Sequence, residues 1–265
     1  KYTLADGTTF DWNNPEHAKD PFGNREARFY STLLADGSPW KPRSSDVVKF
    51  DLFNEIQTGY YTFNDGTIVN GVDTRQGPIE DWNGSRTGIY FKKYTDPNIP
   101  ATWPKNLQKV DVPYFRYAEF LLNYVEASIA LGQEADAKAW LNKLRFRNGL
   151  PAVTESGDDL VQLHRRERDK EFANEGFRLY DMKRWLEGPY SLNKQVRKVL
   201  VTATQKAGSS MTPSNYRKST ADFEYSYKPI DIVFENRAWK DHVYFMPIPQ
   251  NEIDRDPSLL QNPGY

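Results

Sequence analysis

The sequence contains no cysteine, no long apolar run and no excess of charge of either sign, and each absence excludes a class of protein. With 265 residues and no Cys, the chain has no disulfide framework, no zinc-thiolate site and no cysteine nucleophile. The 35 Lys and Arg against 36 Asp and Glu give a net charge of −1, which excludes a nucleic-acid binder held by net charge. The mean hydropathy is −0.78, and no apolar segment approaches the roughly 18–20 residues that cross a bilayer.

Metal-binding and catalytic motifs are also missing. The three histidines, His17, His164 and His242, are too scattered to predict a metal site, so we expect neither a metal nor another cofactor. The chain has no G-x-S-x-G, H-E-x-x-H, G-x-G-x-x-G or Walker sequence. Together these absences make an enzyme an unattractive interpretation.

The residues that are present divide the chain into three zones. Residues 1–112 are rich in turn-forming residues and contain 17 aromatic side chains. Residues 113–188 have helical periodicity and little proline, and residues 189–265 return to loops. A compact domain rarely carries so long a loop-rich segment without a use for it, so we expect the first zone to carry the ligand side of the protein.

Apolar residues at helical spacing predict a first helix pair in the middle zone. One helix covers about residues 117–131 and stops at Gly132, and the next covers 134–148 and stops at Gly149. Glycine adopts the left-handed conformation that ends many helices, so both stops have a physical cause.

A second helix pair follows directly. Its first helix begins near Asp158 or Asp159 as N-cap and runs to Glu175, and a short helix covers residues 179–186. Two consecutive helical hairpins are the unit of an α-solenoid, so the sequence predicts a mainly α fold with long irregular loops and short strands. The two pairs start about 45 residues apart, which is longer than the roughly 34 residues of a strict tetratricopeptide repeat. Because two pairs are fewer than a solenoid needs, we expect further helices to cover them.

One hairpin of strands is predicted in the first zone. Residues 60–63 and 67–69 alternate in the manner of strands, and Asn64-Asp65-Gly66 between them is a turn sequence.

A stripe of carboxylates occupies the predicted third helix. Glu167, Glu171 and Glu175 recur every four residues and are surrounded in sequence by arginines. One interpretation is the acid pair of a glycoside hydrolase, but carboxylates on one helix stripe point the same way and do not flank a scissile bond. We therefore interpret the stripe as an Arg–Glu network that joins this helix to its neighbours.

Aromatic side chains on the loops of the first zone are the candidate binding residues. A sugar ring packs its C–H face on an aromatic plane, while its hydroxyls hydrogen-bond to polar side chains. Most of these aromatics are expected to plug small cores under the loops, and one to three of them to be platforms for a ligand. The predicted glycan-binding residues are Trp40, Tyr60, Tyr61, Trp82, Asn83 and Arg86.

From residue 116 onward, ordered motifs resemble the C-terminal half of SusD/RagB outer-membrane lipoproteins. The weaker match in the first zone is the stretch from Asp20-Pro21 to Arg28-Phe29. The matching blocks are Arg116-Tyr117-Ala118-Glu119 with Gly149-Leu150-Pro151, then Glu167-Arg168, Glu171-Phe172 and Arg184-Trp185, and finally Phe245-Met246-Pro247-Ile248-Pro249-Gln250 with Gln261-Asn262-Pro263-Gly264-Tyr265.

The resemblance implies a SusD-like fold, an α-helical scaffold of tetratricopeptide-like helix pairs with long irregular insertions that carry the ligand site. It also implies a role in nutrient uptake during polysaccharide utilisation. It implies a binding protein, not an enzyme, on the extracellular face of the outer membrane, which passes oligosaccharides to a SusC-like TonB-dependent transporter. It also implies an N-terminal lipid anchor that is absent from this chain, since residues 1–265 match only the C-terminal part of a SusD-like domain and begin without Met.

Three alternatives stay open. The resemblance also implies that some branches of the family take up peptides, so a peptide-binding SusD-like protein is one alternative. A glycoside hydrolase on an α-helical scaffold would need two acids near the aromatics, and Asp73, Glu80 and Asp81 are the only clustered candidates. A plain tetratricopeptide-like interaction module would not explain the loop aromatics.

Overall fold

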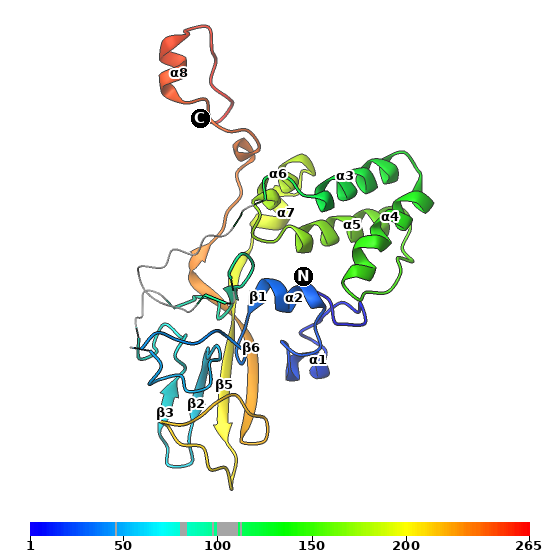
Figure 1. Ribbon diagram of the computed structural model, residues 1–265. Helices are drawn as coiled ribbons and strands as arrows, with labels where there is room; N and C mark the ends of the chain where they lie inside the picture. Colours follow the sequence, from blue (N-terminus) through cyan, green and yellow to red (C-terminus); the bar gives the residue numbers. More distant parts are fainter. Residues whose placement is uncertain (46, 80–83, 97, 100–110, 112) are drawn as a thin grey trace. The chain divides into compact units, whose positions relative to one another are not determined.

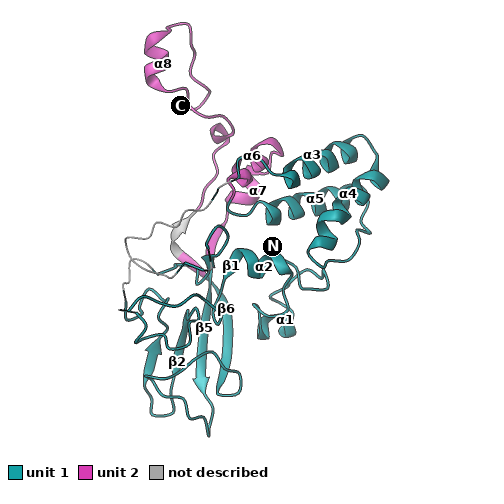
Figure 2. Cartoon of the chain, viewed as in Figure 1, with its two compact units in different colours: residues 1–174, 198–230 teal, residues 175–197, 231–265 magenta. Residues whose placement is uncertain are grey.

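A computed structural model describes residues 1–265 except residues 46, 80–83, 97, 100–110 and 112. The described chain forms two compact units, which Figure 2 distinguishes by colour. Unit 1 comprises residues 1–174 and 198–230, and unit 2 comprises residues 175–197 and 231–265. These boundaries differ from those of the three sequence zones, because two long strands late in the chain begin or end in unit 1.

Three long helices form the main helical part of unit 1, and the positions of the first two confirm the sequence prediction. They are α3 (Tyr117–Ala130), α4 (Glu134–Arg147) and α5 (Gly157–Glu171), and Figure 1 shows α3 running beside both of the others. Leu122 and Val125 of α3 and Leu141 of α4 are fully buried between them. Gly132 and Gly149 have φ angles of 73° and 72°, as expected for residues that end helices.

Helix α5 differs from its prediction at both ends. It begins at Gly157 after Ser156, so neither Asp158 nor Asp159 is its N-cap, although both lie in its acidic first turn. It ends at Glu171, where the chain turns at Phe172, so Glu175 lies outside it. Two short helices that the sequence did not predict, α1 (Pro15–Lys19) and α2 (Ala27–Thr32), precede the first strand of the chain.

The outer face of α3 is apolar as well. Tyr117, Phe120 and Tyr124 are 67%, 62% and 49% exposed, although they recur at helical spacing. A helix with apolar residues on two faces is typical of one packed on both sides. The expectation that other helices cover this one stays a prediction.

A four-stranded sheet corrects the expectation of a mainly α fold with short strands. Its order is β3-β2-β5-β6, formed by β3 (Ile68–Asn70), β2 (Gly59–Thr62), β5 (Gln195–Gln205) and β6 (Phe223–Asn236). A second, two-stranded sheet pairs β1 (Leu33–Leu34) with β4 (Tyr90–Phe91). The described fold is therefore mixed, with helices and sheet both in unit 1.

The predicted hairpin forms between neighbouring segments of the chain, whereas an unpredicted strand pairs with it from a distant segment. β2 and β3 pair antiparallel with Tyr61 opposite Val69, which confirms the hairpin. β5 pairs parallel to β2, with Tyr61 opposite Ala203, so this contact joins segments more than 130 residues apart. β5 contains alternating buried residues, Val201, Ala203 and Gln205, a two-residue period that the interpretation of residues 189–265 as loops overlooked.

Aromatic side chains fill the core of the sheet. One buried cluster joins Tyr61, Phe63, Tyr216 and Phe223 with Ala203. The ring centroids of Tyr61 and Tyr216 lie 4.6 Å apart, and those of Tyr61 and Phe223 lie 5.1 Å apart. Much of the high aromatic content of this chain thus serves the core of the sheet.

A buried network of charged side chains joins α5 to α2 and α4, which confirms the interpretation of the carboxylate stripe. Glu167 is fully buried and accepts hydrogen bonds from Arg28 (2.6 Å), Arg145 (2.8 Å) and Lys170 (2.9 Å). Glu171 forms ion pairs with Arg116 and Arg147 and closes the same network. Burial by itself would raise the pKa of Glu167, but the charges of Arg28 and Lys170 outweigh it and lower the pKa to about 2.

Unit 2 contains the remaining helices. These are α6 (Phe177–Arg184), α7 (Gly188–Leu192), the 3₁₀ helix η1 (Asp241–Tyr244) and α8 (Gln250–Arg255). The predicted helix over residues 179–186 corresponds to α6, shifted by two residues. Among the helices of both units as described, none has the length and apolar character that a membrane span requires.

Candidate functional site

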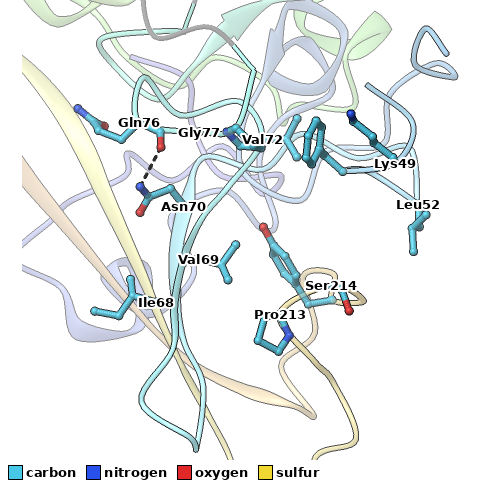
Figure 3. Close-up of a pocket in the computed structure, with 13 residues that line it drawn as sticks. Lys49, Leu52, Ile68, Val69, Asn70, Val72, Gln76, Gly77, Pro213 and Ser214 are labelled. Carbon is cyan, nitrogen blue, oxygen red and sulfur yellow. Dashed lines mark hydrogen bonds between the residues drawn. The ribbon is translucent and has the colours of Figure 1, made fainter. Parts of the chain in front are cut away.

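A pocket of about 500 Å³ opens in unit 1 beside the edge strand β3. Figure 3 shows the β3 residues along one wall, with Lys49 and Leu52 across from them. Four separate segments line it, and most of their side chains are apolar. The lining residues are Lys49, Phe50, Leu52, Ile68, Val69, Asn70, Val72, Gln76, Gly77, Pro78, Pro213, Ser214 and Tyr216.

The guanidinium of Arg43 fixes two walls of this pocket to each other. Its Nε donates to the Asp51 carboxylate at 2.7 Å, and its two terminal nitrogens donate to the Asp73 carboxylate at 2.9 and 2.7 Å. Asp51 belongs to the loop that carries Lys49 and Leu52, whereas Asp73 begins the loop that carries Gln76 and Gly77. Such bidentate pairs are geometrically specific, so Arg43 holds the two loops in register.

The loop after β3 is fixed by its own hydrogen bonds. The side-chain amide of Asn70 donates to the backbone carbonyl of Gln76 at 2.8 Å, which Figure 3 marks with a dashed line. At Gly77, an added Cβ would lie 2.6 Å from the carbonyl oxygen of Gly71, so this close turn requires glycine.

Two of the predicted site residues lie next to the pocket. The Tyr60 hydroxyl donates to Oε1 of Gln76, a pocket residue, at 2.8 Å. Tyr61 follows it in β2 and points to the opposite face, where its fully buried ring packs against Tyr216 beneath the pocket. A ligand cannot stack on Tyr61 in this structure, so its proposed platform role is corrected to a role in the core.

The other predicted site residues do not line the pocket. Trp40 is half-buried, its backbone N–H donates to the Asn54 carbonyl, and the Lys41 ammonium lies 5.1 Å from its ring centroid. Arg86 is exposed. Trp82 and Asn83 lie outside the described residues, as do Glu80 and Asp81. Trp40 and Arg86 stay predictions as binding residues.

The electrostatics around the pocket depend on buried acids. Burial, together with the neighbouring carboxylates of Asp36 and Asp51, raises the pKa of Glu55 to about 7, although the hydrogen bond from the backbone N–H of Lys218 opposes this shift. Burial, aided by the charge of Asp36, also raises the pKa of Tyr216. The Tyr216 hydroxyl therefore stays protonated at neutral pH and is a hydrogen-bond donor.

The pocket has the chemistry of a binding site. The described residues that line it include no Asp or Glu, and the nearby Asp73 is already paired with Arg43. In the described part of the chain there is also no group of three or more His, Cys, Asp or Glu side chains that could hold a metal. Apolar walls with amide and hydroxyl groups at their edges suit a ligand that has both apolar faces and hydroxyls.

The sequence analysis missed most of the lining residues. Phe50, Leu52 and Ile68 are 37%, 54% and 66% exposed, and Pro213 and Ser214 come from a loop far along the chain. One signal was available, because Val47-Val48-Lys49-Phe50-Asp51-Leu52-Phe53 places five apolar residues within seven positions of a loop-rich zone.

Comparisons with known proteins agree with this fold. The sequence model of the SusD family matches residues 1–265. A SusD-like protein of known structure from Bacteroides fragilis is 27% identical, with a TM-score of 0.68, and the match covers 100% of this chain and 45% of that chain. A SusD-like carbohydrate-binding protein from the same species is 23% identical, with a TM-score of 0.59, and the match covers 98% of this chain and 46% of that chain.

This chain therefore spans less than half the length of the solved structures that it resembles. No curated protein matches the sequence.

Proposed function

We propose, since this chain belongs to the SusD family, that it binds oligosaccharide nutrients at the cell surface and delivers them to a SusC-like TonB-dependent transporter. The likeness to a SusD-like carbohydrate-binding protein supports the choice of a glycan. The single observation in this chain that carries the proposal is the pocket beside β3, with its apolar walls and neutral polar edges.

The side chains that line the pocket match the chemical groups of a sugar. The half-exposed ring of Phe50 offers a plane for the C–H face of a pyranose. Asn70 and Gln76 carry side-chain amides, and Ser214 carries a hydroxyl, which are the groups that exchange hydrogen bonds with sugar hydroxyls. Because Arg43 fixes both loops, little ordering is needed when the ligand binds.

We propose binding without hydrolysis. Glycoside hydrolysis needs two carboxyl groups on either side of the scissile bond, and none of the 13 lining residues that the structure describes is acidic. The buried carboxylates of Glu167 and Glu171 are occupied by arginines and are far from solvent. We also propose that the protein is located at the cell surface and held there by an N-terminal lipid anchor, as the family resemblance implies.

Calorimetric titration with a panel of oligosaccharides and short peptides tests this function. A Phe50→Ala variant should bind the best oligosaccharide about 10- to 100-fold more weakly, because a stacked ring contributes roughly 1–3 kcal/mol. Phe91→Ala is the matched control, because Phe91 is also exposed, at 55%, and does not line the pocket. Its affinity should not change.

Three outcomes would contradict the proposal. Binding of peptides alone would favour the peptide alternative, and new reducing ends would favour the hydrolase. Equal loss of affinity in both variants would place the site away from this pocket.

A further inference from the structure

We infer that the pocket selects oligosaccharides that carry an anionic group, such as a uronate carboxylate or a sulfate, and that Lys49 contacts this group. The inference rests on the proposed function and adds the chemical class of its ligand. Lys49 is the one charged side chain among the 13 described residues that line the pocket. A single uncompensated charge at the edge of a neutral pocket favours a ligand of opposite sign.

The charge of Lys49 has no partner within the described part of the chain. No described carboxylate forms an ion pair with its ammonium. Of the described acids in the two loops, Asp51 and Asp73 are bound by Arg43 at 2.7 Å, and Glu55 accepts a hydrogen bond from a backbone N–H. Because these described acids are engaged elsewhere, Lys49 is available to pair with a group from outside.

The position of the ammonium also fits this role. Its Nζ lies 4.8 Å from the centroid of the Phe50 ring, over one of its two faces. A sugar that stacks on the other face has its ring substituents at the rim of Phe50, within reach of this long side chain. A carboxylate or sulfate there gains the attraction of opposite charges in addition to a hydrogen bond, whereas a neutral hydroxyl gains the hydrogen bond alone.

The other polar side chains of the pocket do not distinguish charged ligands from neutral ones. Asn70, Gln76 and Ser214 are neutral and bind hydroxyls of neutral and acidic sugars alike. Discrimination between the two classes therefore falls to Lys49.

A glycan panel with neutral, uronate-containing and sulfated polysaccharides tests the inference by affinity electrophoresis, followed by calorimetry. We expect the tightest ligand to be acidic, its affinity to fall as salt rises, and Lys49→Met to weaken it about three- to tenfold. Lys49→Arg should restore most of the affinity because it keeps the charge. Lys228→Met is the control, because Lys228 is an exposed lysine of β6 that does not line the pocket.

A further pair of probes isolates the charge. For a uronate ligand, chemical reduction of its carboxyl groups to alcohols should reproduce the loss seen in Lys49→Met, and reduction should have no effect on that variant. For a sulfated ligand, chemical removal of the sulfate should likewise weaken binding to the wild type and leave binding to Lys49→Met unchanged.

The outcomes distinguish this inference from the function on which it rests. Tight binding of neutral glycans with no effect of Lys49→Met would overturn the selection of anionic ligands and leave glycan binding in place. Absence of binding to every glycan would overturn the proposed function itself, and the inference with it.

Discussion

Replacing Glu167 by Gln should destabilise the protein strongly without any direct effect on the pocket. Glu167 is fully buried, and its two oxygens accept hydrogen bonds from Arg28, Arg145 and Lys170 at 2.6–2.9 Å. With Glu26, these five side chains carry two negative and three positive charges. The substitution leaves one negative charge against three positive charges in a site that water does not reach.

Two independent routes give similar magnitudes. Removal of one member of a buried ion pair typically costs about 3–5 kcal/mol, because the remaining charges stay buried and unpaired. The pKa of Glu167 is held at about 2 against an ordinary 4.5, which corresponds to about 3 kcal/mol in favour of its charged form. A loss of this size lowers the midpoint of thermal unfolding by roughly 10 °C in a chain of this length.

Urea and thermal unfolding at pH 7, followed by circular dichroism, measure the effect. Glu252→Gln is the matched control, since the Glu252 side chain is 47% exposed and, among the described residues, forms its ion pair with Arg255, which is 74% exposed. It should change the free energy of unfolding by less than about 0.5 kcal/mol. Adding Lys170→Met to Glu167→Gln should recover part of the loss, because it removes one unpaired cation.

Two results would refute this reasoning. Glu167→Gln that is as stable as the control would show that the network contributes little. Normal stability combined with lost glycan binding would show that the carboxylate belongs to a functional site.

Three further predictions concern pH and the aromatic residues. Because the folded pKa of Glu167 is depressed, the stability of the protein should fall as pH drops from about 4.5 towards 2, and acid titration of Glu167→Gln should lack this component. Because the folded pKa of Glu55 is raised to about 7, the stability should fall as pH rises from about 4.5 through 7, so unfolding at pH 8 should show Glu55→Gln to be more stable than wild type. Trp40→Ala tests the sequence prediction at a residue outside the pocket: a platform there requires an about 10- to 100-fold loss of glycan affinity with little change in melting temperature, whereas early melting would make Trp40 a packing residue. Tyr61→Ala should melt early, at a cost of about 3–5 kcal/mol.

The sequence alone determined the local features of this protein. Helices α3 and α4 follow from apolar residues at helical spacing and from Gly132 and Gly149 at their ends, all of which act within a few residues. The hairpin of β2 and β3 follows from the turn Asn64-Asp65-Gly66 for the same reason. The ordered motifs towards the C-terminus were sufficient to indicate the SusD family before the fold was known.

Contacts between distant segments were decided only by the tertiary structure. The sequence showed that Glu167 needed cationic partners, but Arg28, which lies 139 residues earlier, became one of them only when α2 packed beside α5. Likewise, β2 and β3 alone give no reason for β5 to pair with β2, because strand pairing across the chain has no local signal.

The candidate site depends on tertiary structure in the same way. Tyr60 and Tyr61 are neighbours with equivalent chemistry, and only the sheet determines that one faces Gln76 while the other lies in the core. The pocket draws on four segments between Lys49 and Tyr216, none of which forms a concave surface alone. A local pattern specifies which side chains are available, whereas the long-range packing of the chain specifies which of them meet.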